Sequence, residues 1–269
     1  MKVIIILLLI SIISCKNNTD IKKEYDRNGN LSAIHYLRNN KIIDSSHIYV
    51  KNKINQKLFN KRNDSINFVI NYDSKGKKTS KGYIVNKDID FRIKKWHFFK
   101  NKIDSVVEFV NFKNKTYSNQ IWVINNKTRD TIIGRGNHFR SYYKDTIGQR
   151  DTLKLRFYLY EPLISYESDM MLILSEESKT SINDFSNVFK FKRDTFYSLE
   201  NDGIPHPELP DEVPQNHNVN FGIIFENPGT KYLTGYISEY IKIKEKDSST
   251  TREERRIFFK DSIYVNPLY

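Results

Sequence analysis

The densest group of side chains that could do chemistry lies in one proline-rich segment, residues 202–217, DGIPHPELPDEVPQNH. Imidazole and carboxylate groups bind metals and transfer protons, and this segment offers both. The candidate ligand-contacting residues are His206, Glu208, Asp211 and His217. Their spacing matches no metal-ligand motif, and the four prolines exclude a helix that would present them on one face. We therefore expect a stiff, acidic, exposed connection between strands, with no metal and no cofactor; the alternatives are a loop that contacts a ligand or partner and, less favoured, a metal site.

Motifs of the common catalytic classes are not apparent elsewhere. The chain shows no Ser-His-Asp order, no phosphate-binding glycine loop and no recognisable pair of glycosidase carboxylates. The remaining histidines are not placed near a nucleophile or carboxylate pattern: His35, His47, His97 and His138. Catalytic residues are therefore unknown from the sequence.

The single cysteine, Cys15, follows an aliphatic run from Val3 to Ile13. It has no second thiol for a disulfide or a zinc site, and no fold can surround it at the extreme N-terminus. Met1-Lys2, the aliphatic run and the small Ser14 form the pattern of a signal peptide. Eleven helical residues span about 16 Å, well short of the roughly 30 Å hydrocarbon layer. Residues 1–14 are thus predicted to be an export signal.

The sequence Ile12-Ile13-Ser14-Cys15 resembles the lipobox of bacterial lipoproteins. This resemblance implies that Cys15 is acylated, becomes the mature N-terminus and holds the protein on a lipid bilayer, since several acyl chains give stable anchoring. The alternative is an ordinary secretory signal with a coincidental cysteine. Lys16-Asn17-Asn18 lacks the acidic run that resembles surface-export signals of Bacteroidota lipoproteins. We expect a cell-envelope protein on the periplasmic face of the outer membrane, and surface exposure stays open.

The net charge of +12 does not predict nucleic-acid binding. Lys and Arg are interspersed with Asp and Glu, no block of five basic residues occurs, and export separates the chain from nucleic acid. The excess charge indicates mainly a solvated surface, with weak attraction to anionic lipid or glycan as the alternative. The partner that we expect is an envelope protein or a glycan.

Period-two patterns predict strands along almost the whole chain. Residues 66–72, INFVINY, and residues 153–159, LKLRFYL, each place alternate apolar residues on one face. Asparagine pairs and Asn-Lys steps recur at hairpin spacing, because Asn tolerates the left-handed conformation of tight turns. They are Asn39-Asn40, Lys51-Asn52, Asn101-Lys102, Asn114-Lys115 and Asn125-Asn126. The first half is therefore predicted to be an antiparallel meander.

A weak repeat runs through that half. The segment YDRNG at 25–29 recurs as YDSKG at 72–76, and KKWHFFKNKIDSVVEF follows at 94–109. Together they resemble the MORN-like repeats of bacterial lipoproteins, with Trp96 and Phe99 at the aromatic positions and Lys95 where a glycine is usual. The resemblance implies a curved sheet built by repetition and carries over no catalytic residues. The alternative is that Tyr-Asp-x-x-Gly is simply a good turn.

Longer strands separated by prolines are predicted for the second half, which favours an immunoglobulin-like β-sandwich without the disulfide of that class. Glycines within 134–151 suggest the boundary. The predicted fold class is all-β, and the predicted divisions are a signal peptide at 1–14, a tether at 15–22, a repeat meander at 23–140 and a sandwich at 141–269. We expect the fragment from about Tyr142 onward to fold alone.

Two functions from different classes remain. The first is a non-enzymatic, membrane-anchored envelope lipoprotein that binds or interacts with a partner, because two β modules occur without a recognisable active site. The alternative is an envelope hydrolase acting on polysaccharide or peptide, with its carboxylates in the strand ends or in the 202–217 loop.

The anchoring hypothesis predicts the behaviour of Cys15→Ala. Since this change removes the only acylation site, the variant should remain unprocessed or appear in the soluble fraction after cell fractionation. A variant that loses its signal peptide and still sediments with membranes would show that Cys15 is not the anchor.

Overall fold

The computed structural model describes residues 19–38, 42–60, 65–100, 103–175, 184–210, 213–244 and 250–268. Cys15 and the predicted signal peptide lie outside these residues, as do the turns Asn39-Asn40 and Asn101-Lys102. Within the described ranges all regular elements are strands apart from two short 3-10 helices, so the all-β prediction is confirmed. The chain divides into two compact units, residues 1–88 and 89–269. Twelve strands, six from each unit, belong to a long antiparallel meander sheet.

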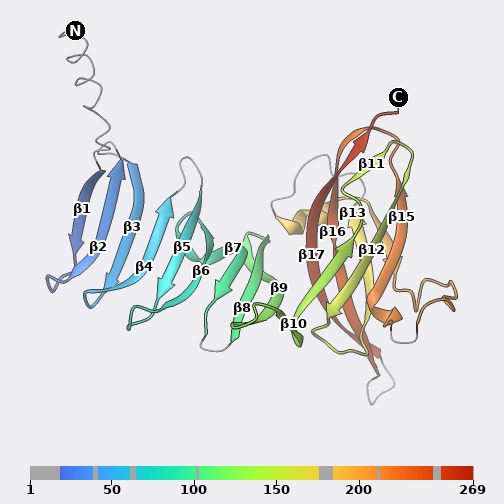
Figure 1. Ribbon diagram of the computed structural model, residues 1–269, viewed down its shortest axis with the longest axis horizontal. Coiled ribbons are helices and arrows are strands. Elements are labelled where there is room, and N and C mark those ends of the chain that lie inside the picture. The colour runs from blue at the N-terminus through green and yellow to red at the C-terminus, as the bar shows by residue number, and fades with distance from the viewer. Residues whose placement is uncertain are drawn as a thin grey trace, which may run out of the picture. The chain divides into compact units, whose positions relative to one another are not determined.

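The first unit is a run of antiparallel hairpins in chain order (Figure 1). Its strands are β1 (Thr19–Tyr25), β2 (Leu31–Arg38), β3 (Ile42–Val50), β4 (Lys53–Asn60), β5 (Ile66–Tyr72) and β6 (Lys78–Val85). The hairpin of β3 and β4 turns through Lys51 and Asn52, both at positive φ, as predicted. The predicted meander is therefore confirmed in this unit.

The two Tyr-Asp-x-x-Gly segments form matching turns. Asp26 Oδ1 accepts backbone N–H groups from Asn28 and Asn30 at 2.8 Å, and Asp73 Oδ1 accepts from Lys75 and Lys77 at 2.9 Å. The glycine of each turn has φ near +78°, a conformation that costs other residues more. The recurring sequence is thus a recurring hairpin turn.

Burial in β5 falls on the face opposite to its apolar pattern. Val69 is fully buried and Asn67 is nearly so, whereas Ile66, Phe68 and Ile70 are half-buried. On the buried face a polar ladder runs across three strands, from Gln56 to Asn71 (3.0 Å) and from Asn71 to Ser80 (2.9 Å). A meander can pair polar side chains between strands in this way, so its period-two pattern did not indicate which face is buried.

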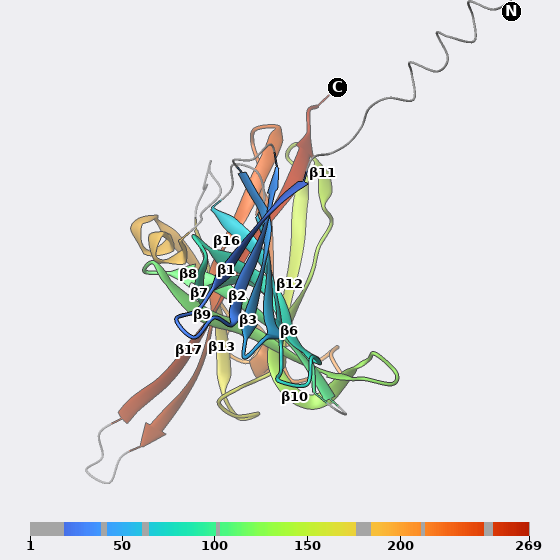
Figure 2. The ribbon, with the colours of Figure 1, turned by 90° about the vertical axis from the view of Figure 1, so that its left-hand side faces the viewer.

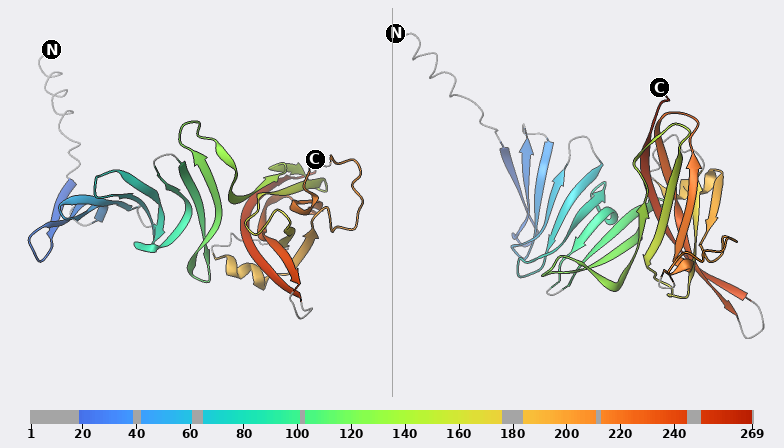
Figure 3. Two further views of the ribbon diagram at one scale, coloured as in Figure 1. Left: turned by 90° about the horizontal axis from the view of Figure 1, so that it is seen from below. Right: turned by 45° about the vertical axis from the view of Figure 1, so that its right-hand side comes forward.

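The second unit contains two sheets. The meander part has β7 (Asp88–Phe98), β8 (Ile103–Phe112), β9 (Lys115–Asn125), β10 (Thr131–Tyr142), β12 (Thr152–Glu161) and β15 (Asn218–Ile224). The other sheet has the order β11 (Thr146–Gly148), β17 (Thr250–Asn266), β16 (Gly229–Lys244), β13 (Asp169–Ser175), β14 (Arg193–Tyr197), with β11 parallel to β17. The short helices are η1 (Phe185–Lys190) and η2 (Gln215–His217). Figure 3, in its left view, shows the strands of this unit curling around one another.

The main core fills the space between these sheets. The inward residues of β12 are Leu153, Leu155, Phe157 and Leu159, each 2 % exposed or less. They belong to one cluster with Met170 and Leu172 of β13, Leu233 and Ile237 of β16, and Ile257 and Ile263 of β17. Burying these side chains is the main favourable term for folding this unit. Figure 2 shows the far end of the β16–β17 hairpin extending away from that core.

The structure divides the chain at a different point from the predicted boundary after residue 140. That position lies inside β10, whose Phe139 packs on the core of the second unit. Gly136, at φ +107°, lies at an irregularity in the pairing of β9 with β10 instead of in a linker. A fragment from Tyr142 would lack these contacts, and the fragment with a complete core begins near residue 89.

Buried polar side chains join the two sheets of this unit. Asn119 of β9 is fully buried, and its amide accepts from Phe258 N–H (2.7 Å) and donates to Phe258 C=O (2.8 Å) and Glu108 Oε2 (2.7 Å). Tyr117 donates to Arg256 C=O at 2.7 Å. The side chain of Asn119 therefore pairs with β17 as a neighbouring strand would.

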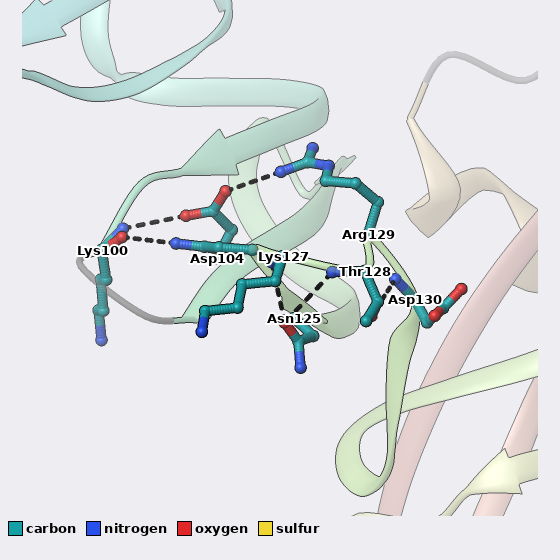
Figure 4. A network of polar contacts seen from close by, with 8 residues as sticks. Lys100, Asp104, Asn125, Lys127, Thr128, Arg129 and Asp130 are labelled. Atoms are coloured by element: carbon teal, nitrogen blue, oxygen red, sulfur yellow. Dashed lines mark hydrogen bonds and ion pairs between the residues drawn. The ribbon is translucent and has the colours of Figure 1, made fainter.

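A second polar network holds the turns at one end of β8 and β9 (Figure 4). Asp104 accepts from Lys100 N–H and from Arg129 Nη1, each at 3.1 Å. Asn125 Oδ1 accepts from Lys127 N–H at 2.9 Å, which caps the turn before β10. The predicted turn at Asn125-Asn126 is thus confirmed, and Asn126 Nδ2 donates to Lys100 C=O at 2.9 Å, whereas the buried Asn126 Oδ1 has no hydrogen-bond partner among the described residues.

Replacing Asn119 should destabilise the second unit strongly. Asn119→Ala leaves the N–H and C=O of Phe258 unpaired in the core, so we expect the free energy of unfolding to fall by about 2–4 kcal/mol. Urea unfolding followed by tryptophan emission measures this, because both tryptophans lie in this unit. Asn227→Ala, at an exposed position, is the matched control and should change the value by less than about 0.5 kcal/mol. Equal effects of the two variants would contradict the linking role.

Candidate functional site

The predicted ligand loop does not gather its candidate residues. His206 Nε2 lies 2.9 Å from Asp202 Oδ2, and His206 Nδ1 lies 3.8 Å from Glu208 Oε1. His217 is 1 % exposed on η2 and faces the core instead. Asp211 lies outside the described residues. Among the residues that the structure does describe, no group of three His, Cys, Asp or Glu side chains could hold a metal ion.

His217 belongs to a buried cluster that sequence analysis missed. Its Nε2 lies 3.2 Å from Ser168 Oγ, and Ser168 Oγ lies 3.1 Å from Glu239 Oε1. Glu239 also accepts the backbone N–H groups of Leu163 (3.1 Å) and Ile164 (2.6 Å). The three side chains come from three distant elements, so no local spacing could have indicated them.

This cluster has the residue types of a catalytic triad but the wrong order. In a triad the histidine lies between the serine and the acid, whereas here Ser168 lies between His217 and Glu239. All three are at most 1 % exposed, which leaves a substrate no access. The arrangement satisfies buried polar groups and connects the end of the 202–217 loop to β13 and β16.

Rings and cations gather on the outward face of the same unit. We call this surface the aromatic face and define it by the rings Trp122, Tyr142, Tyr158 and Tyr160 and the cations Lys95, Arg140, Lys154 and Arg156, together with the buried His138, which packs between Trp122 and Tyr160. Because inward positions of β12 alternate with outward ones, burying Leu153 to Leu159 turns Lys154, Arg156, Tyr158 and Tyr160 outward. Strands β7, β9 and β10 supply the other members.

Most members form one series of contacts, and Tyr142 and Arg156 form a separate pair with the guanidinium 5.9 Å from the ring centroid. Ring centroids of Trp122 and His138 are 5.7 Å apart, those of His138 and Tyr160 are 5.3 Å apart, and those of Tyr160 and Tyr158 are 5.6 Å apart. Lys95 Nζ lies 4.7 Å from the Trp122 ring centroid, and the Arg140 guanidinium lies 4.2 Å from that of Tyr160. These distances fit cation–π attraction, which holds the cations beside the rings.

The aromatic face carries four cations, and one carboxylate, Glu108, lies opposite Lys95 in register and accepts from Asn119 and Gln120. None of its four cations forms an ion pair with a carboxylate of the described residues. The charge of Glu161 acts on His138 and Tyr158, but this residue is only 3 % exposed. Its carboxylate accepts hydrogen bonds from Gly134 N–H (2.7 Å) and Tyr166 OH (3.2 Å). The surface therefore favours anionic ligands.

An open groove of about 550 Å³ lies at one end of the aromatic face. Its lining includes Tyr142, Lys154, Arg156, Asn220 and Gly222 from β10, β12 and β15. Tyr142 and Asn220 flank Arg156 in register on the two neighbouring strands. Arg156 Nε donates to Asn218 Oδ1 at 2.9 Å, which holds the guanidinium in place.

The comparisons with known proteins give no assignment. No protein-family model, no curated protein and no solved structure matches this chain. No helix within the described ranges has both the length and the apolar character needed to cross a bilayer. Function must therefore be argued from the site itself.

Two buried histidines should make the second unit less stable in mild acid. Burial lowers the pKa of His138 and of His217 below the usual value of about 6.5. The charge of Glu161 opposes this shift at His138, and the charge of Glu239 opposes it at His217. The unfolded chain takes up protons as the pH falls through 6.5 while the folded unit does not, so stability present at pH 7 is lost below that value. The expected slope is at most about 1.4 kcal/mol per pH unit for each proton.

Urea unfolding between pH 7 and pH 5, followed by tryptophan emission, measures this slope. His217→Gln removes one of the two titrating groups and should reduce the slope. A free energy of unfolding that stays constant or rises as the pH falls would contradict the assignment.

Proposed function

We propose that this protein is a lipid-anchored, non-enzymatic lipoprotein of the cell envelope that binds an acidic polysaccharide through the aromatic face. The observation that carries the proposal is the series of rings and cations from Lys95 to Tyr158, beside which Tyr142 and Arg156 line an open groove. The series is longer than a single small ligand needs, so it suits a polymer.

The chemistry of the face matches that of an acidic sugar chain. The C–H face of a sugar ring packs on an aromatic ring, and tyrosine and tryptophan add a polar group at their edge. The hydroxyl of Tyr158 is neutral at physiological pH, as an ordinary tyrosine hydroxyl is, and burial raises its pKa further. Arginine and lysine pair with carboxylate groups along the chain. A neutral glycan would leave the four cations without a counter-charge.

A binding role accounts for the buried cluster better than hydrolysis does. The Ser168, His217 and Glu239 side chains are inaccessible, and the exposed face is rich in cations and rings instead of carboxylates. These observations favour binding over the hydrolase alternative. An envelope protein as the ligand is an outcome that the experiment below can detect.

The anchor and the location belong to the same proposal. Cys15 is proposed to be acylated and to hold the protein on the outer membrane, facing the periplasm. The matching turns at Asp26 and Asp73 support MORN-like repeats in the first unit. The two sheets that face each other across the core of the second unit support an immunoglobulin-like sandwich.

Affinity electrophoresis of the full-length protein in detergent tests the proposal. Migration should be retarded in gels containing polygalacturonate and unchanged in gels containing dextran, which is neutral. Retardation should weaken as NaCl rises, because the contacts are charge-assisted. Arg140→Gln should weaken it, and Lys144→Gln, at an exposed position outside the face, should not.

Reducing-end assays on the same mixtures separate binding from hydrolysis. No new reducing ends should appear. Equal migration in both gels would contradict the glycan assignment and favour a protein partner, and release of reducing ends would favour the hydrolase.

A further inference from the structure

We propose that the groove beside Tyr142 is a subsite for one carboxylate-bearing sugar unit, a hexuronate, of the bound chain. This inference rests on the proposed function and adds where the acid group is recognised. The rest of the aromatic face then holds neighbouring units by stacking.

The floor of the groove consists of two register rows on β10, β12 and β15. Tyr142, Arg156 and Asn220 lie opposite one another in one row, and Lys154 lies opposite Gly222 in the next. Neighbouring strands are about 4.8 Å apart, so Tyr142 and Asn220 are separated by roughly 9.5 Å across β12. Arg156 stands between them with its guanidinium 5.9 Å from the Tyr142 ring centroid, so a sugar ring would lie over this row, against the aromatic ring, the guanidinium and the amide.

Charge in the groove points to a single carboxylate. Lys154 and Arg156 are two positions apart on one face of β12, about 7 Å, and both are exposed. No Asp or Glu is among the lining residues. Arg156 uses Nε for Asn218, which leaves the two terminal nitrogens of its planar group for a bidentate contact with a carboxylate.

The remaining lining suits the uncharged part of a sugar. Tyr142 is 50 % exposed and provides a ring on which C–H groups can pack. Asn220 offers both an amide donor and an acceptor for hydroxyl groups. Gly222 lets the Thr152 side chain lie against the floor, because a Cβ at Gly222 would approach Thr152 Cγ2 to 2.8 Å.

Competition with monosaccharides tests the subsite. The full-length protein in detergent is titrated with fluorescent polygalacturonate oligosaccharide and then with glucuronate, glucose or inorganic phosphate. Glucuronate should displace the oligosaccharide at concentrations at least tenfold lower than glucose or phosphate, since only glucuronate combines the ring with the carboxylate. Displacement by phosphate as efficient as by glucuronate would overturn the subsite and indicate a simple anion site.

Variants locate the effect. Arg156→Gln and Tyr142→Ala should each weaken oligosaccharide binding about tenfold, and Arg156→Lys should also weaken it because the planar fork is lost. Lys144→Gln is the matched charge control and should bind as the wild type does. Oligosaccharide binding that these groove variants leave unchanged would overturn the subsite while the proposed function stands. Absence of oligosaccharide binding by the wild type would overturn both.

Discussion

The alternation of side chains along β12 is the constraint on which the rest of the second unit depends. Leu153, Leu155, Phe157 and Leu159 must be covered, and β13, β16 and β17 cover them. The residues between them then have to face outward. A slip of one residue would move Lys154 and Arg156 into the core, at a cost of several kcal/mol for each buried charge. The strand register that buries the core residues of β12 therefore also places the residues of the proposed binding face.

Closing two sheets over this core also buries polar groups, and the structure satisfies them locally. Asn119 pairs with the backbone of Phe258, and Glu239 accepts two backbone N–H groups beside Ser168. The guanidinium of Arg255 donates to Asn119 C=O at 2.9 Å and to Asn137 Oδ1, and burial lowers the pKa of Arg255. These groups resemble catalytic machinery by type, yet their positions follow from the need to pair every buried polar atom.

Local signals made much of the fold predictable from the sequence. The strand at residues 66–72 and the turns at Asp26, Asp73 and Asn52 were correctly placed, because period-two patterns and left-handed turn residues act over a few positions. The alternation in residues 153–159 also correctly predicted which side chains of β12 face inward. The boundary after residue 140 stays a prediction, and the glycines that suggested it, Gly134 and Gly136, belong to β10.

The candidate site was far less predictable. The histidines and carboxylates of the 202–217 loop are close in sequence. In the fold, however, the half-buried His206 pairs with Asp202, and His217 lies in the core. The aromatic face is built from residues of four strands, and its first and last members, Lys95 and Tyr160, are 65 positions apart in the sequence. Only strand pairing, which depends on long-range packing, brings Trp122 beside His138 and Arg156 beside Tyr142.

The central claim is that the aromatic face receives the ligand, and the two tryptophans allow a direct measurement. Trp96 is fully buried, whereas Trp122 is half-buried and belongs to the face. Acrylamide quenching of tryptophan emission is measured with and without saturating polygalacturonate oligosaccharide, in the wild type and in Trp122→Phe. The account predicts that the oligosaccharide protects the wild-type emission and has no effect on the variant. Protection that persists in Trp122→Phe, or quenching that the bound oligosaccharide leaves unchanged in the wild type, would contradict it.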